Sequence, residues 1–166
     1  MLFTGRFERF LCGTLKKFHN RKTNFIFLRF YSLLEVIDRI TSLLPMKSSH
    51  EEAFPFSKGG TIQEIDISRL DDIADQMILE RPILIKMDVQ GFEDKVILGG
   101  LQTIERADIL IVELSLEVLY ESQLLFDDMY KLLTSLGFKY QGNLVQLHSA
   151  VDGKIVQIDG IFVRLN

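Results

Sequence analysis

The sequence predicts an α/β fold in which a parallel strand pair precedes an antiparallel hairpin. Two short runs at 83–87 and 109–112 are almost continuously apolar, which is typical of parallel strands buried on both faces. Helical patterns fill the chain between the two runs, so we expect a crossover connection. Beyond them, an Asp-Gly pair at 152–153 separates two strand-like runs, 138–148 and 154–165, as a hairpin turn does.

The elements before these strands are predicted from turn and capping residues. Residues 61–67 alternate in the manner of a strand, and Ser68 can cap a short helix after it. Pro82 restricts the residue before it, so we expect this helix to end there. Residues 1–40 have no strand–helix alternation. We therefore expect no element of the sheet among them and little packing against the rest of the chain.

Three helices are predicted after the first buried strand. A Gly-Gly pair at 99–100 separates helical patterns at 92–98 and 101–106, because glycine favours the end of a helix. Residues 126–136 place apolar side chains at helical spacing and stop at Gly137. The resulting order of strand, helix, strand, helix and hairpin is typical of an α/β domain.

Length and composition indicate one globular domain. The chain has 166 residues, of which 47% are hydrophobic and 25% charged, and such values are ordinary for a soluble protein. Its single cysteine, Cys12, excludes an internal disulfide and fits a reducing compartment. We find no secretory signal and no apolar stretch of the roughly 20 residues that a bilayer requires. We therefore expect a cytoplasmic protein without a transmembrane segment.

The charge of −4 is unevenly distributed along the chain. Residues 1–47 hold nine Lys and Arg against three acids, whereas residues 48–166 hold ten against twenty. An acidic body argues against nucleic acid as a partner, because phosphate binding requires a basic surface. The basic leader at 1–40 fits an anionic membrane or RNA, and the alternative is a solubilising or poorly ordered leader.

Two acids directly follow the buried strands: Asp88 comes after 83–87 and Glu113 after 109–112. Ligands of open parallel sheets bind beyond the carboxyl ends of strands, and neighbouring strands lie only about 4.8 Å apart. Such a carboxylate pair can orient a hydroxyl or amine, act as a general base or hold a divalent metal ion through its oxygens. The alternative is that both acids only cap the adjacent turn or helix. Lys86, inside the first strand, is expected to pair with an acid.

Two more residues are candidate substrate-binding groups. Glu93 begins the helix after the first strand, and its alternative role is an interaction with the helix dipole. His50 lies in an irregular polar stretch, and its alternative is an inert loop histidine. Gly91 permits a positive φ in the loop between strand and helix. His19 and His148 have no metal-ligand spacing, so we predict no metal site.

One run carries a resemblance to a known family: Ile83-Leu-Ile-Lys-Met-Asp-Val-Gln-Gly-Phe-Glu-Asp-Lys-Val-Ile-Leu-Gly-Gly100. It is similar to the signature of FkbM-type methyltransferases, in which an apolar strand precedes Lys-x-Asp-Val-x-Gly-x-Glu and a helix that ends in glycine. Thr41 to Met46 and His50 to Pro55 resemble a loop that lies upstream in one branch of the family. Ile111-Val-Glu113 and residues 157–164 resemble the next strand and the closing strand. The resemblance thus extends over residues 41–166.

This resemblance implies a Rossmann-like class I methyltransferase fold whose last strand is antiparallel. It also implies S-adenosylmethionine as the cofactor and transfer of its methyl group to an oxygen of a small molecule or sugar. Asp88 matches the acid that lies beside the transferred methyl group in the family, and Glu113 matches its neighbour. Both are therefore the candidate catalytic residues.

The departure from the family concerns the front half of its domain. The family's first strand ends in a Gly-Ala-Asn-x-Gly loop and its second in an acid that holds the ribose, and neither motif precedes Thr41. We therefore expect an incomplete sheet, an exposed edge on strand 83–87 through which copies of the chain can associate, and weak or no cofactor binding. The alternative function is a non-enzymatic α/β remnant that acts as a binding or oligomerisation module.

Overall fold

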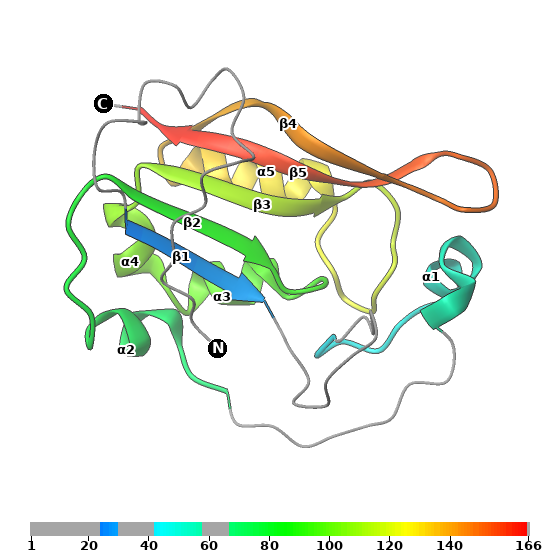
Figure 1. Cartoon of the computed structure of the whole chain (residues 1–166), viewed down its shortest axis with the longest axis horizontal. Helices are drawn as coiled ribbons and strands as arrows, with labels where there is room; N and C mark the ends of the chain where they lie inside the picture. The colour runs from blue at the N-terminus through cyan, green and yellow to red at the C-terminus, as the bar shows by residue number, and fades with distance from the viewer. Residues whose placement is uncertain (1–23, 30–41, 58–66, 166) are drawn as a thin grey trace.

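A computed structural model of the chain describes residues 24–29, 42–57 and 67–165. Five strands form one mixed sheet in the order β1-β2-β3-β5-β4 (Figure 1). β1, β2 and β3 run parallel, and β5 and β4 are antiparallel to their neighbours. The strands are β1 (Asn24–Arg29), β2 (Ile83–Asp88), β3 (Ile109–Ser115), β4 (Phe138–His148) and β5 (Ile155–Arg164). The predicted parallel pair and the C-terminal antiparallel hairpin are confirmed.

The helices that follow the parallel strands gather on one side of the sheet. α3, α4 and α5 all lie behind it in the view of Figure 1, whereas α1 lies apart from them, below the loop of the β4–β5 hairpin. Apart from the 3₁₀ turn η2 (Pro55–Ser57), the helices are α1 (Ser48–Ala53), α2 (Leu70–Ala74), α3 (Glu93–Leu98), α4 (Leu101–Arg106) and α5 (Phe126–Ser135). None of the helices in the described ranges is long and apolar enough to cross a bilayer.

The main core lies between the sheet and these three helices. Alternate residues of β2 and β3 point into it, because successive side chains of a strand face opposite sides. α5 adds Met129 and Leu133, and all the members of the core are buried. The strand and helix residues of this core include Ile83, Ile85, Met87, Leu110, Val112, Leu114, Ile97, Ile104, Ile158 and Phe162.

The face of the sheet that points away from α3, α4 and α5 is apolar at one end of the strands and polar at the other. At the amino ends of β2 and β3 it is apolar and buried, with Leu84, Ile109 and Ile111 among its members. Towards the carboxyl ends it becomes polar. There Lys86 pairs with Asp159 of β5, with 2.5 Å between its Nζ and the nearer carboxylate oxygen. The expectation that Lys86 pairs with an acid is confirmed, and the polar part of this face leads to the edge where the candidate acids lie.

The expectation that residues 1–40 contribute no element of the sheet is wrong. β1 pairs in parallel with β2 over its whole length, from Asn24 opposite Ile83 to Arg29 opposite Asp88. The edge of strand 83–87 that was predicted to be exposed is therefore covered. The prediction relied on strand–helix alternation, whereas β1 pairs with residues almost 60 positions later in the sequence. The expectations for the remainder of 1–40 lie outside the described residues.

The short helix before β2 differs from its prediction. α2 begins after Arg69 rather than Ser68, has no side-chain cap, and ends at Ala74, well before Pro82. Its Asp71 instead caps a different helix, because this buried carboxylate accepts hydrogen bonds from the backbone N–H groups of Gln102 and Thr103 at the start of α4. Most of the predicted strand at 61–67 lies outside the described residues.

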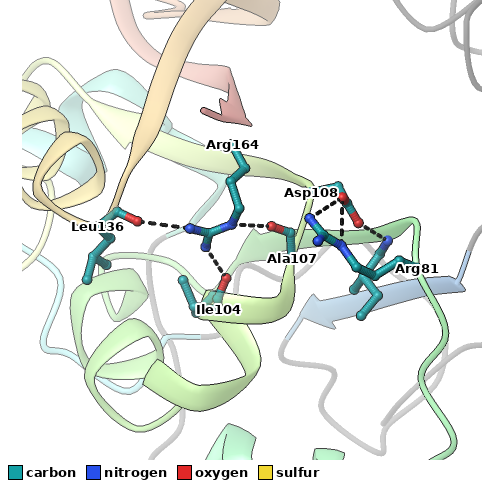
Figure 2. A network of polar contacts seen from close by, with 7 residues as sticks. Arg81, Ile104, Ala107, Asp108, Leu136 and Arg164 are labelled. Carbon is teal, nitrogen blue, oxygen red and sulfur yellow. Dashed lines mark hydrogen bonds and ion pairs between the residues drawn. The ribbon is translucent and has the colours of Figure 1, made fainter. Parts of the chain in front are cut away.

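Arg164 closes the end of the sheet opposite the candidate acids. Its guanidinium donates to the carbonyl oxygens of Ala107, Leu136 and Ile104 at 2.8, 3.2 and 2.7 Å, as Figure 2 shows. The same group lies over the ring of Phe138, 4.2 Å from its centre. One side chain at the end of β5 therefore ties the ends of α4 and α5 to the sheet.

Candidate functional site

The candidate acids lie together at the carboxyl edge of the parallel strands. Asp88 is the last residue of β2, and Glu113 lies two residues before the end of β3, which extends further than predicted. The side-chain amide of Gln90 bridges them: its Nε2 donates to Asp88 Oδ1 at 2.9 Å and to Glu113 Oε2 at 3.1 Å. The two oxygens that share this nitrogen are thus at most about 6 Å apart. The prediction that both carboxylates converge on one edge is confirmed.

A strained turn brings Gln90 into this position. Its φ is +54°, a left-handed conformation that is uncommon for a residue with a side chain, and Gly91 follows with φ +90°. A Cβ at Gly91 would lie 3.0 to 3.2 Å from side-chain atoms of Tyr120, so the turn requires glycine for its space as well as its conformation. The backbone carbonyl of Gln90 also accepts a 2.8 Å hydrogen bond from Ser42 Oγ. Tyr120 thus packs against Gly91 while Ser42 binds the carbonyl of Gln90, and together they hold the turn in place.

Polar side chains continue from Gln90 into the interior. The hydroxyl of Tyr120 donates to Gln90 Oε1 at 2.6 Å and lies 3.1 Å from Nε2 of His50. The other ring nitrogen of His50 lies 3.0 Å from Ser57 Oγ, which donates to the carbonyl of Phe54. We call Gln90, Tyr120, His50 and Ser57 the polar chain. It connects the candidate acids to a histidine that is far from them in the sequence.

His50 reaches this position because its segment docks on the loop after β3. Met46 forms a β-bridge with Tyr120, and the N–H of Lys47 donates to the carbonyl of Leu119 at 2.9 Å. The irregular stretch that was predicted around His50 is helix α1, and the imidazole is only 1% exposed. Its burial lowers the pKa of His50, although the charge of Glu51 opposes this effect. Two side chains, Tyr120 and Gln90, separate His50 from the acids at the edge of the site.

Glu93 lies buried beside Asp88 and Glu113 at the same edge of the sheet. It is the first residue of α3 and is buried, and its Oε1 accepts a hydrogen bond from the N–H of Val89 at 3.0 Å. Burial raises the pKa of Glu93 to about 7, and the charge of Asp88 acts in the same direction, while backbone hydrogen bonds oppose it. Glu93 is therefore an acid that changes its charge near neutral pH.

Glu113 is subject to the same effects more strongly. Its burial raises its pKa well above the usual value, and the charges of Asp88, Glu93 and Asp159 raise it further, while Lys86 lowers it. Burial, followed by the charges of Glu113, Glu93 and Asp88, also raises the pKa of Tyr120. The edge is thus an acidic, partly desolvated site whose buried carboxyl groups bind protons more tightly than in water.

This arrangement suits two kinds of chemistry. A cation that binds at the edge relieves the repulsion among its acids, and a carboxylate with a raised pKa is a better proton acceptor than an ordinary one. Within the described part of the chain, no three His, Cys, Asp or Glu side chains are grouped so that they could hold a metal ion.

The structure joins the four predicted site residues into one hydrogen-bonded and electrostatic cluster. Asp88 and Glu113 share Gln90, Glu93 lies beside them, and His50 is connected through Tyr120. Sequence reasoning missed Gln90 and Tyr120. Gln90 lies within the quoted signature and could have been found from its place between Asp88 and Gly91. Tyr120 carries no such signal, because only the folding of the loop after β3 brings it to the site.

Comparison with known proteins gives two matches. The profile of the methyltransferase FkbM domain matches residues 30–140. The 2-O-methyltransferase NoeI of Sinorhizobium fredii (strain NBRC 101917 / NGR234) is 41% identical over 71 residues, which are 43% of this chain and 29% of that protein. The matched stretch thus spans less than a third of this relative. No solved structure matches the chain.

Proposed function

The chain belongs to the methyltransferase FkbM domain family, and from this premise we propose that it transfers a methyl group from S-adenosylmethionine to an oxygen of a small molecule or sugar. The observation that carries the proposal is the acid pair, Asp88 and Glu113, held by one amide at the carboxyl edge of neighbouring parallel strands. The acceptor oxygen is suggested by the 2-O-methyltransferase to which part of the chain is similar.

The order of the strands supports a Rossmann-like class I methyltransferase fold for this chain. Three parallel strands are followed by an antiparallel hairpin whose last strand, β5, lies between β3 and β4. The carboxyl ends of β1 and β2 meet at the acid edge, since Arg29 pairs with Asp88. In open sheets this edge is the usual position of a ligand.

The acid edge fits the cationic part of the cofactor. When bound, S-adenosylmethionine supplies a methyl group on a positively charged sulfur. Asp88, Glu93 and Glu113 offer negative charge there, and their mutual repulsion together with burial raises the pKa of Glu93 and Glu113. A nearby positive charge lowers such pKa values and is bound more tightly for the same reason. We propose that Asp88 and Glu113 hold this charge.

The acid pair also serves the acceptor. A hydroxyl that gains a methyl group must lose its proton, and a carboxylate within hydrogen-bonding distance can accept it. Glu113 suits this role because burial and neighbouring acids raise its pKa. Asp88, at the end of β2, orients the hydroxyl. Glu93 and His50 are proposed to support the substrate side of the site, His50 through Tyr120 and Gln90.

Titration of the chain with S-adenosylmethionine tests this proposal. We expect saturable but weak binding, with a dissociation constant of about 0.1 to 1 mM, because the sequence lacks the family's glycine loop before Thr41. The Asp88→Asn variant should weaken the binding about tenfold or more, since a hydrogen-bonded charge contributes roughly 1.5–3 kcal/mol. Calorimetry at high protein concentration, or shifts of amide signals at residues 88–91, measures both.

The exposed Asp127 of α5 supplies the matched control, because Asp127→Asn removes the same charge away from the site. It should bind the cofactor as the unaltered chain does. Binding that is equally weak in both variants and the parent, without saturation, would contradict the proposal. That result would favour the alternative of a non-enzymatic α/β module.

A further inference from the structure

The geometry points to Gln90 as a positioning residue of the proposed site: we infer that its side-chain amide holds Asp88 and Glu113 as a pair, and that Tyr120 and His50 fix which way the amide faces. The inference rests on the proposed function only where it concerns what the acid pair does. The hydrogen bonds of Gln90 themselves are present in the folded chain without a ligand. Gln90 lies in a left-handed turn with φ +54°. Such strained residues persist where the surrounding structure determines them, and they cluster at functional sites.

The orientation of the amide decides whether it binds or repels the acids. With Nε2 towards Asp88 and Glu113, each carboxylate accepts an N–H, at 2.9 and 3.1 Å. Rotated by half a turn, the amide would present its oxygen to two acidic groups and lose both hydrogen bonds. A donor on the far side of the amide therefore selects the productive orientation. Tyr120 is that donor, since its hydroxyl reaches Gln90 Oε1 at 2.6 Å.

His50 in turn decides where the single proton of the Tyr120 hydroxyl points. Because that proton is directed to Gln90, the contact of 3.1 Å between His50 Nε2 and the hydroxyl requires a hydrogen on Nε2. If Nε2 lacked the hydrogen, Tyr120 would donate to His50 instead, and Gln90 Oε1 would lose its partner. The proton on His50 Nε2 thus sets the direction of the whole polar chain.

The far end of the polar chain adds one more constraint. Ser57 Oγ uses its hydrogen to donate to the carbonyl of Phe54. Its contact with His50 Nδ1 is therefore a hydrogen bond only when Nδ1 carries a hydrogen. Every hydrogen bond in the chain is made when His50 is an imidazolium. Burial lowers the pKa of His50 and opposes this form. A neutral His50 with its hydrogen on Nε2 still donates to the Tyr120 hydroxyl, so Tyr120 still donates to Gln90.

Titration of the carboxyl groups tests the inference without any ligand. Carbon-13 NMR should follow Glu113 in the parent chain and in the Gln90→Met and Tyr120→Phe variants. A hydrogen bond to the charged form lowers a pKa, so both variants should titrate at higher pH than the parent, Gln90→Met more than Tyr120→Phe. The other groups that act on Glu113, namely Asp88, Glu93, Asp159 and Lys86, are unchanged in both variants.

Two comparisons separate positioning from a general loss of structure. Gln76→Met removes a similar side-chain hydrogen bond, from an exposed amide to the carbonyl of Asp72, and should leave the Glu113 titration unchanged. Tyr120→Phe removes a single oxygen, so it keeps the test open if Gln90→Met does not fold. An unchanged Glu113 titration in folded Gln90→Met or Tyr120→Phe would overturn the inference.

Cofactor binding by the same variants connects the inference to the proposed function. Gln90→Met should bind S-adenosylmethionine about tenfold more weakly than the parent near neutral pH. The difference should shrink at higher pH, where Glu113 is ionised in both proteins. If the parent itself binds no cofactor, the proposed function fails, and the titration arm still decides the role of Gln90. If the parent binds and Gln90→Met binds equally well at every pH, the inference fails and the proposed function stands.

Discussion

At the scale of single residues, the site depends on acids that burial keeps partly protonated. Glu93 lies under the turn that carries Gln90, accepts a hydrogen bond from Val89, and is 5% exposed. Ionisation of a buried carboxylate destabilises the folded state, because burial removes the charge from water. Ionisation of Glu93 therefore costs stability at neutral pH.

This cost predicts the effect of Glu93→Gln. The pKa of Glu93 is raised from 4.5 to about 7, first by burial and then by Asp88. The native state thus holds a proton that the unfolded chain has released, so stability falls as pH rises between these two values. Glu93→Gln removes this loss and should gain up to about 3 kcal/mol relative to the parent between pH 4.5 and 8.

Urea unfolding at several pH values measures this difference. Glutamine retains an oxygen that can accept the N–H of Val89, so the comparison isolates the charge. Glu105→Gln on the exposed side of α4 provides the control for loss of one carboxylate. If Glu93→Gln and the parent differ by the same amount at pH 4.5 and 8, Glu93 does not ionise in this range.

At the scale of elements, one side chain connects several of them. Arg164, at the end of β5, donates to three carbonyl oxygens (Figure 2). One belongs to the last turn of α4, one to the residue that follows α4, and one to the residue that follows α5. Its guanidinium also lies over the ring of Phe138 in β4. Helices leave their last carbonyl groups without partners inside the helix. Arg164 supplies such partners, and in doing so it fixes how α4 and α5 sit against the sheet.

We expect Arg164→Met to destabilise the fold by about 2–4 kcal/mol, because methionine keeps the apolar stem but removes three hydrogen bonds to carbonyl groups, of which that of Ile104 keeps the N–H of Ala107 as a donor. Thermal or urea unfolding measures the loss. Arg106→Met is the matched control, since exposed Arg106 donates one hydrogen bond to Leu79, and it should cost less than about 1 kcal/mol. Equal losses in the two variants would mean that Arg164 acts only as a surface cation.

At the scale of the whole molecule, β1 changes the character of the sheet. With β1 in place, β2 is an inner strand with neighbours on both sides, and the carboxyl ends of three parallel strands meet near the acid pair. An unpaired β2 would present a row of free N–H and C=O groups to other chains. β1 thus removes the edge through which association was expected, and it extends the edge on which a ligand can bind.

Hydrogen exchange distinguishes an inner β2 from an edge strand. Amides along a strand point alternately to its two sides, so all the amides of residues 84–87 should be protected when β1 and β3 flank them. β4 provides an internal control, because β5 is its one neighbour among the described strands, and alternate amides there should exchange quickly. An alternating pattern of fast and slow exchange in residues 84–87 would contradict the pairing of β1.

The sequence by itself determined the elements whose pattern is local. The apolar runs of β2 and β3 are recognisable because both their faces are buried, and the hairpin and the ends of α3 and α5 follow from glycine. The position of Asp88 and Glu113 at one edge follows as well, since parallel neighbours end on the same side. Sequence resemblance also indicated the family.

The tertiary structure decided what depends on contacts between distant segments. The place of β1 was determined by pairing with residues almost 60 positions later in the sequence, which no local pattern indicates. His50 and Tyr120 are separated by 70 residues and Tyr120 and Gln90 by 30, so their contacts exist only after α1 has docked on the loop that follows β3. Neither a period of hydrophobic residues nor a turn residue marks such contacts, because hydrogen bonds between side chains depend on distance in space and leave no local pattern along the chain.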